Sequence, residues 1–451
     1  MNSKTIQEII FILIFLLGGI TFLAYVNLYE LIIIYIGSIT AISYTIRKEY
    51  TVFLFVFFLS FGPLIHTKYN LLGLIGVDEI VSLGAIMFFV GSKTKPFKYL
   101  DKYKKLAIYL LVVIIAIQYY NYVKGVILDL SDNTITYLLK KPINYFLLLY
   151  PFIGIVKRIE SPEIEKMVLY GIYSSVLVLL VTMVYNREIL SLGFYAESIS
   201  EQYNPESGEY VRGAGLYRAG GDINGFGIFI VTIFGFFISK IEREKFLYKY
   251  VPVLFAAAYG MFISGSRTAM LGFGAILAIF ILRNFRKTVT IKSIIFGIIF
   301  LSVFSSIIYP AYLRFYEESA TTHLNPEAGR AGRIGKWIIY TEYMLNNPNT
   351  FIFGNSSHIN YARNPHNYFV LITYRAGLIA SIVIIVLLWR RFKYAFQEKH
   401  GLFMLYFLIP YFGGLMTVNT AMNGIYVFIF IALNYNEIVR DKNLKLSLKG
   451  N

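Results

Sequence analysis

The sequence predicts an all-α, polytopic membrane protein. Of its 451 residues, 57% are hydrophobic and only 15% are charged, and the mean hydropathy is +0.60. A soluble protein of this length would need far more charged surface, so the bilayer is the expected solvent. Aromatic residues make up 18% of the chain, which fits many helix ends at the level of the lipid headgroups. Cysteine is absent, which excludes disulfides, thiolate metal sites and cysteine nucleophiles.

Long apolar runs recur along the whole chain. A hydrocarbon core about 30 Å thick needs roughly 20 apolar residues in a helix, and backbone groups inside it must pair within the segment. We therefore predict about 14 transmembrane helices (12–14). The expected spans are 9–26, 28–46, 51–65, 71–90, 106–123, 137–156, 167–185, 223–238, 250–264, 268–282, 293–309, 368–389, 402–418 and 421–439. Several are short enough to be re-entrant or broken, and the segment 137–156, with Lys140, Lys141 and Pro142, fits the pattern least. The first run lacks a signal-peptide cleavage site, so we expect a retained first helix.

The basic residues orient these spans. With both termini in the cytoplasm, most of the 42 Lys and Arg residues fall in cytoplasmic segments, as the positive-inside rule requires. These segments are 47–48, 93–105, 157–166, 240–249, 283–292, 390–399 and the tail from 440. This distribution explains the net charge of +16 without a nucleic-acid partner. Two long external segments remain, 186–221 and 310–367, in a chain that we expect to form one integral membrane domain over 1–451. Long loops in compact proteins usually carry function.

Three arginine-bearing motifs lie on the predicted external side. The first runs from Arg212 through Arg218 to Asn224 as RGAGLYRAGGDIN. Its glycines permit close backbone approach to a ligand, and the following helix N-terminus favours anions. The alternative is that Gly221 and Gly225 only let helices pack closely.

The other two arginine motifs are shorter. Ser264-Gly-Ser-Arg267-Thr forms a tight turn between two spans, where a lone arginine could instead extend to the membrane interface. Gly332-Arg333-x-x-x-Trp337 lies in the second long segment, and its two large side chains share a face if the segment is an ordinary solvated helix. A guanidinium stays charged and binds phosphate oxygens in a bidentate manner. Several arginines on the outside, against the charge rule, indicate an anionic lipid headgroup.

One histidine follows these motifs on the same predicted side. In Asn364-Pro-His366-Asn367 the proline precedes an apolar run, which places His366 near a helix N-terminus. The helix dipole and nearby arginines disfavour the charged imidazolium, so His366 can act as a general base. The alternative is an interfacial histidine that caps the helix. The five histidines include no H-E-x-x-H pair, so no metal site is expected.

In this order, the motifs resemble the O-antigen polymerase and O-antigen ligase superfamily of bacterial membrane glycosyltransferases. The closest marks are Ser264-Gly-Ser-Arg267-Thr and the His366-Asn367 pair, with Gly377 after nine intervening residues. The likeness covers residues 212–380, whereas the N-terminal helices match only in hydropathy. Ala380 and Gly221-Asp222-Ile depart from the family pattern, which leaves the sub-family open.

The resemblance implies a GT-C-like fold in the bacterial inner membrane with a periplasmic active site. It also implies a cofactor-free, metal-independent transfer from an undecaprenyl-pyrophosphate-linked oligosaccharide. Arg212 and Arg267 would bind the pyrophosphate, and His366 would take the proton from the acceptor hydroxyl. Arg333 and Arg218 are further candidates for phosphate binding or loop ordering. The supporting side chains would be Asn224, Ser266, Asn367 and Trp337. Besides membrane lipids and the lipid-linked oligosaccharide, a chain-length-regulating co-polymerase is a conceivable partner.

The reaction that we predict is polymerisation of lipid-linked repeat units into O-antigen or a related surface polysaccharide, as in lipopolysaccharide biosynthesis. A ligase or protein O-oligosaccharyltransferase would use the same donor with a different acceptor. Nothing in the sequence identifies the acceptor. A flippase or other transporter should carry internal repeats and charged helices near the midplane. Asp78 and Glu79, expected inside the span 71–90, leave open a groove, an ion site or a misplaced helix end.

Overall fold

The computed structural model describes about half of the chain, and its helices and strands lie there. These residues are 3–26, 28–59, 77–91, 147, 150–155, 158–159, 161–184, 203–204, 209–210, 223–244, 248–264, 266–288, 333–355, 367–396, 404–415, 429–430 and 433. Apart from one two-residue β-ladder, the regular elements in them are helices, so the all-α prediction is confirmed for this part. The predicted spans 106–123 and 293–309 lie outside the described residues.

The chain divides into two compact units. The first contains Met1–Tyr99 and Leu139–Asp222, and the second contains Leu100–Leu138 and Ile223–Asn451. Each unit brings together segments that are far apart in the sequence. The expected single integral membrane domain over residues 1–451 stays a prediction.

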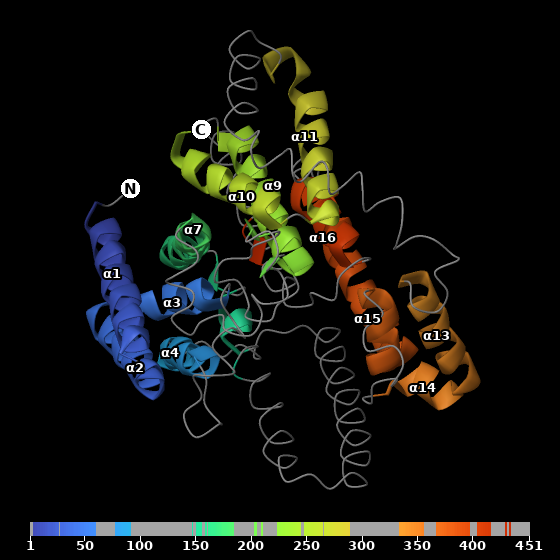
Figure 1. Cartoon of the computed structure of the whole chain (residues 1–451), viewed down its shortest axis with the longest axis horizontal. Coiled ribbons are helices and arrows are strands. Elements are labelled where there is room, and N and C mark those ends of the chain that lie inside the picture. The colour runs from blue at the N-terminus through green and yellow to red at the C-terminus, as the bar shows by residue number, and fades with distance from the viewer. Residues whose placement is uncertain are drawn as a thin grey trace, which may run out of the picture. The chain divides into compact units, whose positions relative to one another are not determined.

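The first unit is built around a helix that is apolar on every side. Its elements are α1 (Ser3–Tyr25), α2 (Tyr29–Ile46), α3 (Tyr50–Leu59), α4 (Val77–Gly91), α7 (Pro162–Val184), β1 (Tyr203–Asn204) and β2 (Glu209–Tyr210). Every residue of α3 from Tyr50 to Phe58 is buried, as expected for a helix without a polar face. Helices α2, α4 and α7 pack against it (Figure 1). Gly171 lets α7 approach so closely that an added Cβ would lie 2.9 Å from Cβ of Val56.

The second unit contains two groups of helices. One group is α9 (Ile223–Glu244), the 3₁₀ turn η2 (Tyr248–Tyr250), α10 (Val251–Ser264), α11 (Arg267–Thr288) and α16 (Leu405–Leu415). The other is α13 (Arg333–Asn346), α14 (Pro348–Phe353) and α15 (Tyr368–Phe396). Figure 1 shows α13 and α14 lying beside one end of α15, in agreement with the contacts among the three helices.

Glycines allow α16 to pack directly on both α9 and α11. A Cβ added to Gly235 of α9 would lie 2.0 Å from the carbonyl oxygen of Tyr406, and one added to Gly272 of α11 would lie 2.9 Å from Cβ of Pro410. No side chain of any size fits at the first position without separating the helices. Close backbone approach at small residues is how helices associate where the surroundings are as apolar as their side chains.

Contacts along α9, α11 and α16 set the directions of these helices. Phe234 of α9 lies beside Phe273 of α11, with ring centroids 4.7 Å apart. Further along both helices, Arg283 Nε donates to Glu242 Oε1 at 2.9 Å. Helices α9 and α11 therefore run parallel. The hydroxyl of Tyr406, near the start of α16, donates to Oε2 of the same Glu242, so α16 runs antiparallel to both.

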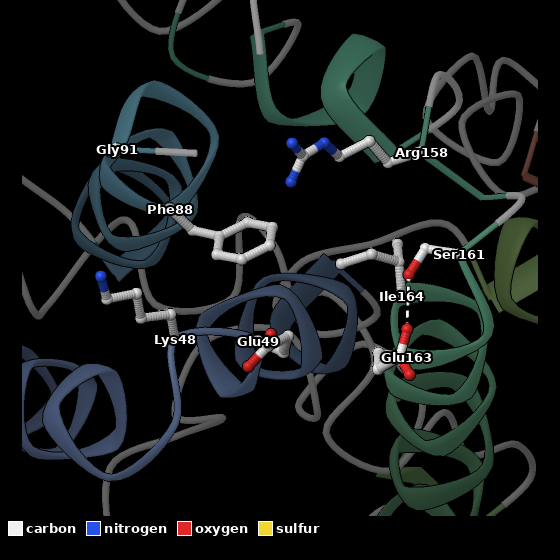
Figure 2. A pocket seen from close by; sticks show the side chains of 8 residues that line it. All are labelled: Lys48, Glu49, Phe88, Gly91, Arg158, Ser161, Glu163 and Ile164. Atoms are coloured by element: carbon white, nitrogen blue, oxygen red, sulfur yellow. Dashed lines mark hydrogen bonds between the residues drawn. The ribbon is translucent and has the colours of Figure 1, made fainter. Parts of the chain in front are cut away.

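These directions agree with the alternation predicted from the basic residues. The segments 240–249 and 283–292, expected on one membrane side, begin at the helix ends that Glu242 and Arg283 join. In the first unit, Lys48 and Arg158, from two other segments expected on that side, line one cavity (Figure 2). Within each unit these helix ends lie close together, and the membrane topology itself stays a prediction.

The number of membrane spans is not settled by helix length. Among the described residues, one helix is long and apolar enough to cross a bilayer by length and composition, with a window at Lys4–Leu23 and a mean hydropathy of 2.3. Six shorter apolar helices of 10–17 residues accompany it. Helices α9, α11 and α15 continue past the predicted span ends to Glu244, Thr288 and Phe396. Hydropathy misses these extensions because Lys, Arg and Glu end the apolar run but are good helix formers.

The described part of α4 contains Glu79, which is 5% exposed. Residues 71–76 of the predicted span 71–90 lie outside the described residues, so the place of Asp78 and Glu79 within that span stays a prediction.

The absence of cysteine makes the topology directly testable. Glu342 on α13 and Lys166 on α7 are both exposed, and the predicted topology places them on opposite sides of the membrane. We expect an impermeant thiol reagent to label Glu342→Cys in intact spheroplasts and to label Lys166→Cys only after permeabilisation. Tyr340 would be a poor probe of the same segment because it is fully buried. Protection of Glu342→Cys, or labelling of Lys166→Cys in sealed spheroplasts, would refute the orientation.

Candidate functional site

The predicted site motifs coincide with helix N-termini in the second unit. Helix α9 begins at Ile223, directly before Asn224, and α11 begins at Arg267. Helix α13 begins at Arg333, and α15 begins at Tyr368, directly after Asn367. The unpaired N–H groups and the dipole of a helix N-terminus attract anions. Arg267 and Asn367 therefore lie at helix starts, where the backbone favours an anion, whereas the residues directly before Ile223 and Arg333 lie outside the described residues.

Two of these N-termini lie at the same end of the helix group. Because α9 and α11 are parallel and in direct contact, both begin at the same end of the helix group. That Asn224 and Arg267 belong to one pyrophosphate site stays a prediction. The side chains of both residues lie outside the described part of the structure, and so does the side chain of Arg333.

Ser266 begins α11 as its N-cap. Its side chain is fully buried, and its Oγ accepts a long hydrogen bond of 3.4 Å from the N–H of Ala269. A serine side chain in this position satisfies one of the free donors of the first turn. The expected supporting role of Ser266 therefore takes the form of fixing the helix start at Arg267.

Asn367 performs the same task for α15 with better geometry. Its Oδ1 accepts hydrogen bonds from the N–H groups of Phe369 at 3.0 Å and Val370 at 3.2 Å. The residue is 4% exposed, so the cap is shielded from water. His366 itself lies outside the described residues, but the chain must pass from it directly into this cap.

A pair of glycines holds α14 against α15. Gly354, which ends α14, has φ +85°, and Gly377 within α15 has φ +78°. A Cβ on Gly377 would lie 2.2 Å from the carbonyl oxygen of Ile352, and one on Gly354 would lie 2.3 Å from that of Arg375. Both the left-handed conformation and the lack of space require glycine. Gly377 also kinks α15, so the predicted continuous span 368–389 is a broken helix.

The glycine contact fixes the first segment of α15 to the second external segment. The N–H of Asn355 donates to the carbonyl oxygen of Tyr374 at 2.7 Å, which adds a backbone hydrogen bond beside the two glycines. In the sequence, Gly377 stood out only because it follows the His366-Asn367 pair after nine residues. In the structure this glycine holds the helix that begins beside His366.

An aromatic cluster attaches α13 to the same part of α15. Tyr340 and Tyr374 are buried, and their rings meet edge to face with centroids 4.8 Å apart. Tyr343 contacts the Tyr374 ring at 5.8 Å. Such pairs contribute about 0.5–1.5 kcal/mol beyond area burial. Nothing in the hydropathy of the sequence marks these tyrosines as part of a site, and their cluster was not predicted.

Trp337 and Arg333 lie on α13, one helical turn apart. Trp337 is partly buried, and its carbonyl oxygen accepts a hydrogen bond from the Thr341 hydroxyl at 2.8 Å. The helix itself is what the alternative of an ordinary helix predicts, and a phosphate-binding role of Arg333 stays a prediction. The exposed Arg375 lies on α15, and its charge partly offsets the rise that burial causes in the pKa of Tyr340.

Three central residues of the predicted site lie outside the described residues. These are Arg212, Arg218 and His366, so their meeting with Arg267 stays a prediction. In the described ranges, no group of three or more His, Cys, Asp or Glu side chains could hold a metal ion. The described residues form a framework for the predicted site. The caps Ser266 and Asn367 fix the starts of α11 and α15, and the glycine contact holds α14 against α15.

Comparison with known proteins adds no family to this framework. No protein-family model, no curated protein and no solved structure matches the chain.

Proposed function

We propose that the chain is a membrane glycosyltransferase that polymerises oligosaccharide repeat units linked to a polyprenyl pyrophosphate. The proposal includes about 14 membrane spans, an inner-membrane location and a catalytic site on the periplasmic face. The observation that carries it is the start of α11 at Arg267, directly after the cap Ser266, and the start of α15 directly after the cap Asn367. Helix starts beside guanidinium groups form a binding surface for a diphosphate.

The parallel contact of α9 and α11 supports the donor site. Both helices begin at the same end of the helix group. A guanidinium can bind phosphate oxygens with two parallel hydrogen bonds, so Arg267 at one of these starts suits a diphosphate. Arg212 and Arg218 precede α9 in the sequence and would complete this site.

The capped start of α15 supports the assignment of His366 as the base. The positive end of the α15 dipole and the donor-site arginines both disfavour imidazolium, so the ring stays neutral and able to accept a proton. Asn367 keeps the helix start in place through two hydrogen bonds. The glycine contact of Gly377 with Ile352 then prevents the segment from rotating.

The reaction balances without a metal or cofactor. The acceptor hydroxyl oxygen attacks the anomeric carbon of the donor chain, and the bond from that carbon to the phosphate oxygen breaks. The polyprenyl pyrophosphate leaves with the electron pair, and His366 takes the hydroxyl proton. Arg267 and Arg212 stabilise the charge that develops on the leaving oxygen. Positioning of the two bound substrates supplies much of the remaining rate.

Two other functions make different predictions. A ligase would use the same donor and the same residues with a lipid A or protein acceptor, so only the acceptor requirement separates it from a polymerase. A transporter would need ionisable groups near the membrane midplane.

The histidine is tested by reconstitution with one lipid-linked repeat unit. We expect the wild-type chain to produce a ladder of polymers and His366→Ala to lose about 10²–10⁴-fold in rate, because a positioned base contributes that much. His358→Ala in the same external segment is the matched control and should keep the ladder. A wild-type ladder from His366→Ala would remove the histidine from the mechanism. Inertness of the wild type until lipid A or protein is added would make it a ligase.

The arginine is tested by a charge-conserving exchange. Arg267→Lys keeps the charge but loses the planar fork, so we expect the rate to fall about 10²–10³-fold, the loss typical of one charge-stabilising group. Arg286→Lys, at the opposite end of the same helix, should retain full activity. Equal activity of the two variants would mean that Arg267 only extends to the membrane interface.

The cap on α15 is tested with two substitutions at one position. Asn367→Ala removes the side-chain acceptor and should destabilise the helix start by about 1 kcal/mol. We expect kcat to fall while KM for the donor stays unchanged, since donor binding depends on α9 and α11. Asn367→Ser restores a cap and should restore kcat. If the alanine variant keeps the wild-type kcat, the cap does not position His366.

A further inference from the structure

Helix α14 ends in two exposed apolar side chains. Ile352 and Phe353 are 38% and 44% exposed, whereas the exposed residues at the start of the helix include the polar Asn347 and Asn349. Exposed apolar residues on a spanning helix are explained by lipid. Helix α14 has only six residues and belongs to the second predicted external segment, so it does not span the membrane. Its apolar end therefore marks a surface that something else covers.

The glycine contact fixes the position of this end along α15. A Cβ on Gly377 would lie 2.2 Å from the carbonyl oxygen of Ile352 and 2.7 Å from the carbonyl carbon of Phe353. The two exposed side chains are therefore attached to backbone that touches α15 at Gly377, and Figure 1 shows α14 beside this helix. The depth of Gly377 in the membrane is then also the depth of the end of α14.

The basic end of α15 determines that depth. After Gly377 the helix continues to Phe396, and its apolar run ends at Trp389, directly before Arg390 and Arg391. In the predicted topology these arginines lie at the cytoplasmic surface. The 13 residues from Gly377 to Arg390 extend about 20 Å, whereas the hydrocarbon core is about 30 Å thick. A tilted helix would reach less far, so the glycine contact lies at least about 10 Å inside the outer boundary of the core.

The second segment of α15 carries an exposed apolar face that begins at this contact. Ile379, Ile382 and Val386 are exposed, and their spacing of three and four residues puts them on one face of the helix. Ile379 follows Gly377 by two residues, so both helices bear exposed apolar side chains close to the glycine contact. In the predicted topology the exposed face of α15 contacts acyl chains. The apolar end of α14 is continuous with a surface of this kind.

The backbone at the end of α14 is paired, as a position inside the hydrocarbon core requires. The N–H of Gly354 donates to the carbonyl oxygen of Thr350 at 2.8 Å, and the N–H of Asn355 donates to that of Tyr374 at 2.7 Å. Irregular backbone at this depth is tolerated only where its polar groups are satisfied by protein. The chain therefore leaves α14 without exposing these two N–H groups to lipid.

We propose that α14 is inserted in the outer leaflet of the membrane. Ile352 and Phe353 lie among the acyl chains, and Asn347 and Asn349 lie toward the headgroups, about one short helix length away. The lipid surface is thus a binding partner of the second external segment, which it holds down beside the first segment of α15. The proposal depends on α15 spanning the membrane, which is part of the proposed function, and is independent of the glycosyl transfer.

The test measures the depth of single side chains in the full-length protein. Because the chain has no cysteine, Phe353→Cys provides one attachment point for a nitroxide spin label in proteoliposomes. Asn349→Cys on the same helix is the matched control, and Ile382→Cys on α15 is the reference for the acyl chains. Power-saturation EPR compares relaxation by oxygen, which concentrates among acyl chains, with relaxation by a water-soluble nickel complex. We expect oxygen to dominate at positions 353 and 382 and nickel to dominate at position 349.

The outcomes separate the insertion of α14 from the span of α15. If nickel relaxes the label at position 353 as strongly as at position 349, α14 lies in water and the proposal is overturned, while an oxygen response at position 382 leaves the span intact. Weak relaxation by both reagents at position 353 would indicate a contact with protein, such as a second copy of the chain, and would also overturn it. Nickel access at position 382 would refute span and insertion together.

A second position guards against a local effect of one label. Ile352→Cys moves the label by one residue at the same end of α14, and the proposal requires the oxygen response at both positions. Both side chains are exposed, so a label replaces surface and not core packing. The measurement needs no substrate, so the insertion and the glycosyl transfer can each fail without the other.

Discussion

The contact of α16 with α9 and α11 determines where the candidate donor site lies. Gly235 and Gly272 permit this contact because any larger side chain would meet Tyr406 or Pro410. With α16 in place, Glu242 binds both Arg283 and the Tyr406 hydroxyl, which joins the last turns of α9 and α11 to the start of α16. The two parallel helices begin at the opposite end of the group. In the proposed function, packing many residues away therefore determines where the starts of α9 and α11 lie.

The first turns of these helices are suited to an anion because their backbone donors have no partners within the helix. Ser266 and Asn367 satisfy some of these donors and thereby define where each helix begins. The residue adjacent to each cap is Arg267 in one case and His366 in the other. A cap that is buried, as both of these are, holds its neighbour in one place more firmly than a solvated loop could. Capping and catalysis are therefore compatible explanations of the same motif, and the capping alternative considered from the sequence does not exclude the functional one.

Hydropathy predicted the apolar helices of the described part, since apolar runs are a property of local composition. It did not predict α13 and α14, which lie in the segment 310–367 between the predicted spans. It also missed the break at Gly377. That glycine has a positive φ and lies against Ile352, a contact between segments that no local pattern reveals. The role of Tyr340 escaped prediction for the same reason, because its burial comes from Tyr374 on another helix.

In the proposed reaction the pyrophosphate leaving group gains negative charge as its bond to the sugar breaks, so its attraction to an arginine is greatest in the transition state. A carboxylate beside a guanidinium lowers that gain, because it already neutralises part of the charge. Asp222 lies within the first arginine motif, and Glu327 and Glu342 lie close to the third, whereas Ser264-Gly-Ser-Arg267-Thr contains no acid. Arg267 is therefore the arginine whose local sequence best suits stabilisation of the leaving group in the proposed reaction.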